Sequence, residues 1–268
     1  MKREERLNAI LEMLSRFGKI EVEDIVRRLE VSPATARRDL DSLAASSLLS
    51  RTHGGAVSNT VAYDLPVRYQ KEDAAVQKHA IAVLAASMVT QDMVVGLSGG
   101  TTSSAIATQL GMRRELVNDS GRTTFTVVTN AVNIASMLAV RTHVKVMVTG
   151  GVLNPRSYEL VGPFAEQSLE KVTLDVAFVG INGLEAHIGP TVSDEFEASI
   201  NDLMIRRARR SYLVCDSSKI GHSAFATLAR STFSALITDD GITAEQQREL
   251  VESGIPVIVA DPRPGAPR

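Results

Sequence analysis

The residues best suited to chemistry in this sequence are Ser98, Gly99, Gly100, Thr101 and Thr102. Glycines let the backbone approach a ligand closely, so that N–H groups point outward, and the hydroxyl side chains add donors. The segment follows an apolar stretch and opens a helical pattern, and a helix N-terminus favours anions. These properties predict a phosphate-binding loop. The Gly-Lys-Ser/Thr ending of a Walker A motif is absent, and tight packing is the alternative role of such a loop.

Polar residues and glycines also follow four further predicted strands, at the edge where parallel sheets bind ligands. They are Asn130, Gly151, Asn182, Asp216 and Lys219. Lys219 would neutralise a phosphate, and Asp216 and Asn130 would hydrogen-bond to hydroxyl groups. With the glycine-rich loop, these residues form the predicted effector site. The structural alternatives are a helix cap for Asn130, a turn former for Asp216 and a surface lysine for Lys219.

A second set of residues, near the N-terminus, is suited to DNA. Ser32 is a good N-cap and Pro33 suits the first helical position, so a helix is predicted from there. Ser32 and Thr35 would contact phosphates, and Arg37 or Arg38 would hydrogen-bond to guanine. Consecutive helical residues point about 100° apart, so one arginine would contact bases and the other a phosphate. A solvated helix face is the alternative, and the sequence leaves open which arginine does which.

A predicted wing completes this DNA-binding head. Arg51 and His53 would contact the DNA backbone or minor groove, and Gly54 with Gly55 permits a tight turn close to phosphates. Asp39 would hold one guanidinium in place. The predicted DNA-binding residues are Ser32, Thr35, Arg37, Arg38, Arg51, His53 and Gly54.

Apolar spacing predicts the elements that carry both sets. In the head it gives helices over 3–16, 22–30 and 33–45, then two short strands over 48–57. Beyond the head, seven short apolar strands are predicted over 93–97, 125–129, 144–148, 176–179, 212–215, 235–238 and 256–260. Helical patterns lie between them, over 76–89, 102–111, 131–140, 163–170, 194–210 and 243–252. This alternation predicts an α/β domain with a mostly parallel sheet, behind an all-α winged helix-turn-helix.

Composition supports a division into domains. The 268 residues have a net charge of −2, so any DNA binding depends on a local patch. Residues 1–58 hold 10 Lys and Arg against 9 Asp and Glu. The prediction is a DNA-binding domain over 1–58, a linker over 59–75, an effector domain over 76–260 and a flexible tail over 261–268.

Several classes of protein are disfavoured. Cys215 is the single cysteine, so no intramolecular disulfide forms, and the N-terminus lacks a signal-peptide pattern. The longest apolar stretch, 80–89, is too short to cross a bilayer. We therefore expect a cytoplasmic protein. The five histidines are scattered, so neither a metal nor a cofactor is expected.

The head sequence resembles the signature of the deoxyribose-operon repressor (DeoR) family, VS-x-x-T-x-RRDL followed by R-x-HGGA. The matching residues are Val31, Ser32, Thr35, Arg37, Arg38, Asp39, Leu40, Leu43, Arg51, His53, Gly54, Gly55 and Ala56. The resemblance extends to about residue 230. It implies a transcriptional regulator, usually a repressor of carbohydrate-metabolism genes, whose operator binding is modulated by a phosphorylated sugar.

The resemblance also implies a sensor similar in fold to ribose-5-phosphate isomerase. It assigns phosphate binding to the loop from Ser98 to Thr102, and the family's D-x-S-K segment maps onto Asp216, Ser218 and Lys219. The chain departs from the family at two positions. Asn182 stands where the turn usually has Asp, and Ser98 stands where Asp is frequent, so the effector here is expected to differ.

Two other functions compete with this interpretation. A sugar-phosphate isomerase would need a carboxylate base, for which Glu195 or Glu197 is available. It would also need an acid at Asn182 and a lysine after it, and residues 183–196 contain no lysine. A protein-binding module is the other alternative, and a steep salt dependence would distinguish DNA binding from it. Because helix-turn-helix proteins usually bind paired half-sites, we expect a homo-oligomer bound to double-stranded operator DNA.

Overall fold

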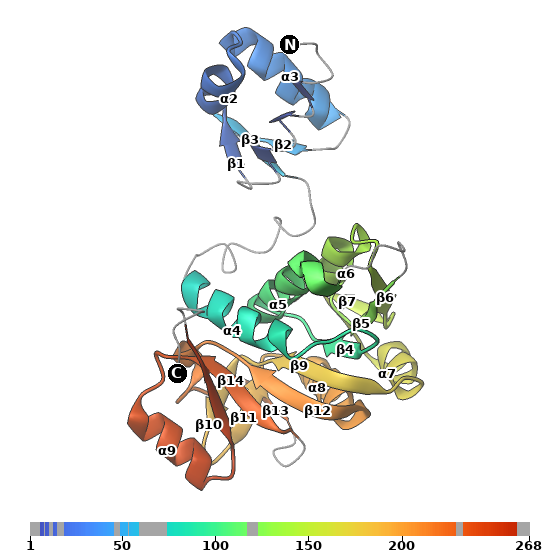
Figure 1. Cartoon of the computed structure of the whole chain (residues 1–268), viewed down its shortest axis with the longest axis vertical. Coiled ribbons are helices and arrows are strands. Elements are labelled where there is room, and N and C mark those ends of the chain that lie inside the picture. Colours follow the sequence, from blue (N-terminus) through green and yellow to red (C-terminus); the bar gives the residue numbers. More distant parts are fainter. Residues whose placement is uncertain are drawn as a thin grey trace. The chain divides into compact units, whose positions relative to one another are not determined.

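The chain folds as two compact units, Met1–Lys71 and Glu72–Arg268 (Figure 1). The computed structural model describes residues 6–7, 9–10, 13–14, 19–45, 49–52, 54–58, 74–116, 123–228 and 233–261. The predicted linker therefore lies almost wholly outside the described residues, as do 262–268 of the predicted tail. No helix in the described ranges is long and apolar enough to cross a membrane.

The first unit combines helices with a three-stranded antiparallel sheet. Its elements are β1 (Lys19–Glu21), α2 (Val22–Leu29), α3 (Pro33–Ala45), β2 (Leu49–Arg51) and β3 (Gly55–Ser58), with the strands in the order β1-β3-β2. Its core contains the fully buried Ile25, Ala36 and Leu40. The predicted helices 22–30 and 33–45 and both wing strands are confirmed. Strand β1 was not predicted, because three residues carry too short a pattern. The predicted first helix lies mostly outside the described residues.

The second unit is built on a seven-stranded sheet in which all neighbours run parallel. The strands in sheet order are β15 (Val257–Ala260), β14 (Ala235–Asp239), β12 (Ala208–Val214), β9 (Leu174–Gly180), β4 (Val94–Leu97), β5 (Phe125–Thr129) and β6 (Val144–Val148). All seven predicted strands are present. The chain adds β5 and β6 on one side of β4 and then β9, β12, β14 and β15 on the other, so the strand order reverses between β4 and β9.

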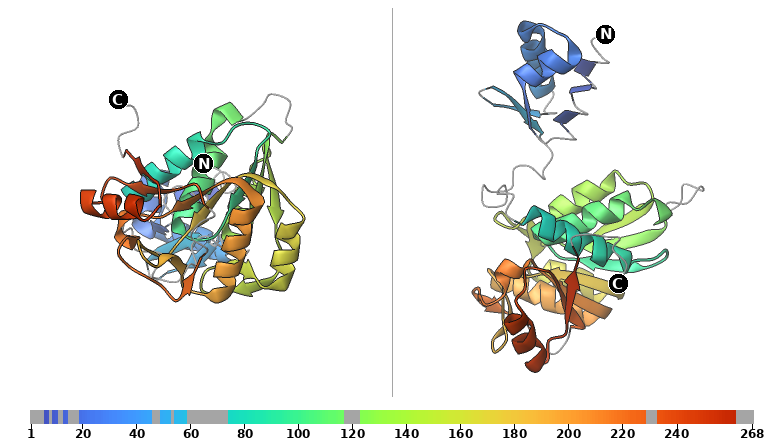
Figure 2. Two further views of the ribbon diagram at one scale, coloured as in Figure 1. Left: turned by 90° about the horizontal axis from the view of Figure 1, so that it is seen from below. Right: turned by 60° about the vertical axis from the view of Figure 1, so that its left-hand side comes forward.

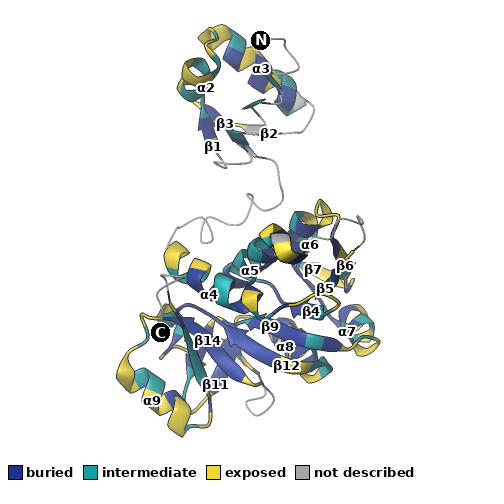
Figure 3. Ribbon diagram, in the orientation of Figure 1, coloured by how far each residue is buried: buried dark blue, intermediate teal, exposed yellow. Residues whose placement is uncertain are grey.

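Helices cover both faces of this sheet (Figure 2). One core joins the sheet to α4 (Ala75–Ser87), α5 (Thr101–Met112) and α6 (Val132–Ala139). The other joins it to α7 (Pro163–Glu170), α8 (Glu195–Arg207) and α9 (Ala244–Glu252). Along β9, Phe178 packs into the first core and Val179 into the second, as alternation in a strand requires. The central strands are therefore buried, the edge strands β6 and β15 are only partly buried, and the helices are exposed on their outer sides (Figure 3).

One helix boundary was predicted wrongly. The pattern over 194–210 predicted a single helix, but α8 ends at Arg207 and residues 208–210 already belong to β12. Ala208 pairs with Leu174 of β9, so sheet pairing outweighs the helical tendency of the arginine-rich run.

Five short strands of the second unit were also missed. Strands β7 (Val152–Asn154) and β8 (Glu159–Val161) form a hairpin. Strands β10 (Gly183–Glu185), β11 (Gly189–Val192) and β13 (Ala226–Thr227) form a small antiparallel sheet. Strands of two to four residues are too short for alternation to distinguish them from loops.

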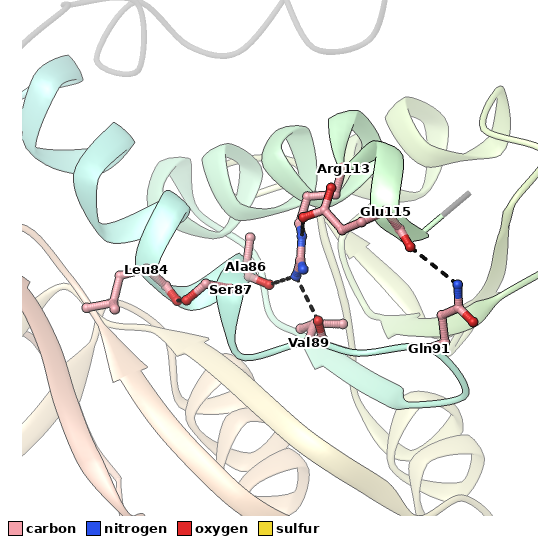
Figure 4. A network of polar contacts seen from close by, with 7 residues as sticks. All are labelled: Leu84, Ala86, Ser87, Val89, Gln91, Arg113 and Glu115. Carbon is pink, nitrogen blue, oxygen red and sulfur yellow. Dashed lines mark hydrogen bonds and ion pairs between the residues drawn. The ribbon is translucent and has the colours of Figure 1, made fainter. Parts of the chain in front are cut away.

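A network around Arg113 joins the C-terminal ends of α4 and α5 (Figure 4). The guanidinium donates to the carbonyl oxygens of Ala86 and Val89, the latter at 2.7 Å, and to the Glu115 carboxylate at 2.8 Å. The Glu115 carbonyl in turn accepts from Gln91 at 3.3 Å. These contacts tie the backbone carbonyls at the end of α4 to the end of α5, whose other end carries the glycine-rich loop.

Candidate effector site and DNA-binding head

The glycine-rich loop connects β4 to the N-terminus of α5. Gly100 is the N-cap, with φ +96°, and no side chain caps the helix. The first backbone bond of the helix runs from the Ser104 N–H to the Gly100 carbonyl at 3.0 Å, so the N–H groups of Thr101, Thr102 and Ser103 have no partner within the helix. A side chain at Gly100 would meet nothing within 4 Å. The loop therefore presents donors on an open side, as anion binding requires.

Ser98 joins the two strands at which the sheet order reverses. Its side chain is buried, and its Oγ accepts a hydrogen bond from the Gly180 N–H at 2.8 Å. Its own N–H donates to the Phe178 carbonyl at 3.3 Å. Ser98 therefore holds the start of the loop against β9. The N–H groups at the start of α5 form the open side of the loop.

Asn130 contacts a carboxyl group instead of capping a helix. Its Nδ2 donates to Glu159 Oε2 at 2.9 Å and to the Leu160 carbonyl at 3.4 Å. The N-cap of α6 is Ala131, without a side-chain cap, so the helix-cap alternative is wrong. Asn130 is fully buried, and its Oδ1 has no hydrogen-bond partner among the described residues.

Glu159, on β8, is a candidate functional residue that the sequence did not reveal. Its carboxyl lies against the loop, because a Cβ on Gly99 would be 2.3 Å from Glu159 Oε1. Burial, and after it the nearby charge of Glu197, raises the pKa of Glu159 to about 8. Glu197 Oε1 accepts from Asn154 Nδ2 at 3.0 Å. The sequence offered one clue to Glu159, namely an acidic residue directly before the apolar pair Leu160 and Val161.

Two predicted site residues have structural roles. Gly151 has φ +116°, and a Cβ there would lie 2.7 Å from the Val161 carbonyl oxygen, so close packing of the β7–β8 hairpin requires glycine. The Asn182 side chain accepts from the Ser193 N–H at 3.1 Å and is otherwise exposed. It ties the end of β9 to the segment before α8.

Asp216 and Lys219 follow β12. The buried Asp216 carboxylate accepts from the Ser218 N–H at 3.2 Å and lies 3.9 Å from Lys78 Nζ, so its turn-forming role is confirmed. Lys219 is half-buried and forms no ion pair with the residues that the structure describes. The neighbouring Cys215 is buried, and burial raises the pKa of its thiol.

In the head, the predicted cap of α3 is present. Ser32 Oγ accepts from the Thr35 N–H at 3.2 Å, and the two hydroxyl oxygens are 2.9 Å apart. Arg37 and Arg38 are exposed and Ala36 is fully buried. The third helix therefore keeps its apolar side in the core and both arginine side chains in solvent.

Asp39 does not hold either of these arginines. It is buried and pairs with Arg6, which donates to it through Nε and through Nη2, the latter at 3.1 Å. Arg37 and Arg38 lie on the exposed side of α3, which directs them away from this carboxylate. The expectation that Asp39 orients a DNA-contacting guanidinium was therefore wrong for these two residues.

The wing is fixed by close backbone contacts. Arg51 donates to the Gly55 carbonyl at 2.6 Å and contacts Asp41 at 2.9 Å. A Cβ on Gly55 would lie 1.9 Å from the Ile20 carbonyl oxygen, whereas one on Gly54 would approach only the end of the Glu21 side chain. His53 lies outside the described residues.

Comparison with known proteins agrees with both halves of this arrangement. The family described as "DeoR C terminal sensor domain" matches residues 73–240, and the "DeoR-like helix-turn-helix domain" matches residues 6–62. The chain belongs to the DeoR family. It is therefore a DNA-binding transcriptional regulator with a small-molecule sensor domain.

Relatives of this DeoR-family regulator match it over nearly their whole length. It is 34% identical over 256 residues to the HTH-type transcriptional regulator GlpR of Haloferax volcanii, covering 95% of this chain and 96% of that one. It is 30% identical to the glycerol-3-phosphate regulon repressor of Escherichia coli, covering 89% and 92%. It is 32% identical to the lactose phosphotransferase system repressor of Streptococcus mutans, covering 89% and 93%.

Among solved structures, the regulator is similar to ribose 5-phosphate isomerase A of Methanocaldococcus jannaschii. That similarity has a TM-score of 0.38 and 19% identity and covers 53% of each chain. Similarity to eIF2B delta of Chaetomium thermophilum has a TM-score of 0.43 and 14% identity and covers 60% and 55%. Both are distant, and the family assignment rests on the sequence matches.

Proposed function

We propose that this DeoR-family regulator represses genes of carbohydrate metabolism, and that a phosphorylated sugar or related metabolite modulates its binding to double-stranded operator DNA. The observation that carries the effector half is the open side of the β4–α5 loop. There the backbone N–H groups that follow Gly100 form the positive end of α5, a helix of 12 residues. The relatives named for glycerol 3-phosphate and for a lactose phosphotransferase system favour the same class of ligand.

The position of the loop in the sheet supports this site. Ligands of open parallel sheets bind where the strand order reverses, outside the carboxyl ends of the strands. That point lies between β4 and β9, where Ser98 joins the two strands. Thr101 is partly exposed beside it. Lys219 follows a strand on the same edge and would supply a positive charge to a phosphate.

For DNA, we propose that α3 enters the major groove with Arg37 and Arg38 facing the duplex. Ser32 and Thr35 would contact phosphates. Arg51 and His53 of the wing would contact the DNA backbone or minor groove, with Gly54 close to phosphates. One head makes few contacts, so a homo-oligomer would place two heads on two half-sites. The effector then changes operator affinity to the extent that it binds one arrangement of the heads better than another.

We propose that the sensor has no isomerase activity. An isomerase needs a positioned base and groups that stabilise an enediolate. Asn182 cannot transfer a proton as a carboxylate does, its side chain is engaged by the Ser193 N–H, and no lysine follows before Phe196. Glu195 is exposed at the start of α8, where a negative charge is favoured by the helix dipole.

The test combines DNA binding with a ligand panel. Binding of the full-length protein to DNA from upstream of its own gene is measured by fluorescence anisotropy at increasing salt, with a scrambled duplex as control. We expect specific binding that weakens steeply with salt, because phosphate contacts release counterions. Sugar phosphates and the matching free sugars are then added. A phosphorylated compound that changes affinity while its free sugar does not supports the proposal; binding insensitive to every phosphorylated compound contradicts the effector half.

A further inference from the structure

The β7–β8 hairpin has one strand edge that is covered and one that is not. On the covered side, the Leu160 N–H donates to the Asn130 carbonyl at 2.7 Å, and the Tyr158 carbonyl accepts from the Val132 N–H at 3.0 Å. Strand β8 therefore lies between β7 and the segment that joins β5 to α6. Strand β7 pairs with β8 alone among the strands that the structure describes. We call the outer edge of β7 the free edge.

The bonds on the covered side fix which backbone groups of β7 face outward. Hydrogen-bonded and non-hydrogen-bonded pairs alternate along an antiparallel ladder. Because Leu160 uses its N–H on the side away from β7, its cross-strand partner Leu153 belongs to a non-hydrogen-bonded pair of the hairpin. The N–H and the carbonyl of Leu153 therefore point to the free edge, where they are available to another strand.

The free edge is apolar and carries no charge. Val152 is 67% exposed and Leu153 is 45% exposed. Consecutive residues of a strand point to opposite faces, so both faces of β7 are uncovered. Residues 146–155 contain no Asp, Glu, Lys or Arg. Natural proteins usually protect an unpaired strand edge with charged side chains, so an uncharged edge favours an interface.

Two further apolar side chains flank the free edge. Val148, the last residue of β6, is exposed, and so is Phe164 in the first turn of α7. A Cβ on Gly151 would lie 3.0 Å from the Ala165 Cβ, so β7 begins beside that turn. One exposed apolar residue is ordinary on a protein surface, but a group of them along an unpaired strand marks a binding surface.

A second copy of this chain fits the free edge. In a two-fold interface each surface meets itself, so a charged edge would meet its own charge, whereas this uncharged edge does not. Two β7 strands that pair antiparallel around Leu153 exchange the outward N–H and carbonyl of that residue. Val152 of one copy then lies opposite Asn154 of the other. Arg156, the nearest charged residue along the chain, lies opposite Gly150.

We propose that two copies of this regulator associate through β7, by antiparallel pairing centred on Leu153, into one sheet in the order β8-β7-β7-β8. The inference rests on the proposed function, in which a homo-oligomer places two heads on two half-sites, and it adds where the copies meet. Strand β8 carries Glu159, whose carboxyl lies against Gly99 of the effector loop. A ligand that favours one position of the hairpin then favours one arrangement of the two copies.

The first experiment places charge at the centre of the proposed pair. Leu153→Lys and Leu153→Glu each bring two like charges opposite one another and should weaken self-association of the full-length protein by about tenfold or more. Sedimentation velocity over a range of concentrations measures the dissociation constant. An equimolar mixture of the two variants brings opposite charges together and should recover association to within about threefold of the unaltered protein. Val251→Lys, at an exposed apolar residue of α9, is the matched control and should change nothing.

The second experiment traps the pair without weakening it. In a hydrogen-bonded antiparallel pair the two Cα atoms are about 5.5 Å apart, within the range that a disulfide spans. Leu153→Cys at low protein concentration should therefore form a disulfide-linked dimer on oxidation with copper phenanthroline, seen on a non-reducing gel. Val251→Cys should not. The natural Cys215 is buried and does not compete.

The outcomes separate this inference from the proposed function. If the unaltered protein is an oligomer and both charge variants associate as it does, the copies do not meet at β7, while the proposed function stands. The same conclusion follows if the mixture does not recover association or if Leu153→Cys yields no linked dimer. If the unaltered protein is a monomer both in solution and on operator DNA, the proposed homo-oligomer fails and this inference fails with it. Circular dichroism of each variant confirms that a loss of association is not a loss of fold.

Discussion

The two units of this regulator place their polar side chains in opposite environments. In the head, Arg37 and Arg38 stand in solvent over an apolar core. In the sensor, Asn130 and Glu159 are buried beneath a loop. Exposed cations suit a partner whose phosphates lie on its surface, as in duplex DNA. Buried polar groups with free hydrogen-bonding capacity suit a ligand small enough to be enclosed.

This contrast also explains what the sequence could reveal. Exposed site residues of the head are free of packing constraints, so a short motif such as Ser32-Pro33 followed by two arginines predicts them directly. In the sensor, the site depends on contacts between distant strands. Such contacts leave no local signal, and Glu159 was missed although it lies against the predicted loop.

The largest predicted effect is a loss of stability confined to the DNA-binding head. Gly55→Ala places a Cβ 1.9 Å from the Ile20 backbone oxygen, and backbone cannot move aside as a side chain can. We expect the head to lose about 3 kcal/mol of stability and operator binding to disappear. Gly54→Ala, which meets only the end of the Glu21 side chain, should cost about 1 kcal/mol or less. Operator binding and thermal melting check both, and equal effects of the two substitutions would contradict the described wing.

A smaller effect should separate DNA contact from fold. Arg37→Ala and Arg38→Ala should each weaken operator binding by about 1–3 kcal/mol. Each substitution removes an exposed guanidinium that would contact the DNA. The melting temperature and the response to ligand should not change. Arg209→Ala, an arginine of the sensor with a side chain 83% exposed, is the control for lost charge. Normal operator binding by both head variants would exclude α3 as the DNA-contacting helix.

A third prediction concerns the pH dependence of stability. The pKa of Glu159 is raised from 4.5 to about 8, so from pH 4.5 upward the unfolded chain releases a proton that the folded chain keeps. Stability should therefore fall as pH rises through this window. Glu159→Gln removes the penalty and should be more stable than the unaltered sensor near pH 8. The difference should shrink toward pH 5 or so.

Urea unfolding followed across this pH range measures the difference. Glu195→Gln, exposed at the start of α8, should show no such pH-dependent gap. A constant difference between Glu159→Gln and the unaltered protein at every pH would mean that the pKa of Glu159 is not raised in the folded state.

The smallest predicted effect concerns the junction of β4 and β9. Ser98→Ala removes the acceptor of the Gly180 N–H, a bond of 2.8 Å, and should cost about 1 kcal/mol. Ligand binding at the loop should weaken with it. Ser87→Ala removes an exposed hydroxyl that donates to the Leu84 carbonyl and should cost less than about 0.5 kcal/mol. An equal loss of stability in Ser98→Ala and Ser87→Ala would show that the hydrogen bond from Gly180 to Ser98 does not support the loop.

Most of the fold could be predicted, and less of the site. The seven sheet strands are apolar runs long enough to stand out, and Ser98 to Thr102 form a recognisable turn. The order of the strands was not predictable, because it depends on which side of β4 each later strand joins. Contacts between residues far apart in the sequence were not predictable either, such as that of Asn130 with Glu159 and that of Arg6 with Asp39.

The central position of β4 has a consequence for how the sensor is built. Ser98 and Gly180, which meet across the reversal of strand order, are 82 residues apart in the sequence. During synthesis the glycine-rich loop leaves the ribosome early, with α5 and β5, but β9 closes its other side only after the intervening hairpin and α7 have been made. Pairings of such long range form slowly. A nascent or truncated chain that ends before β9 thus contains the loop sequence without the binding site, and only a chain whose second half has docked can report on a metabolite.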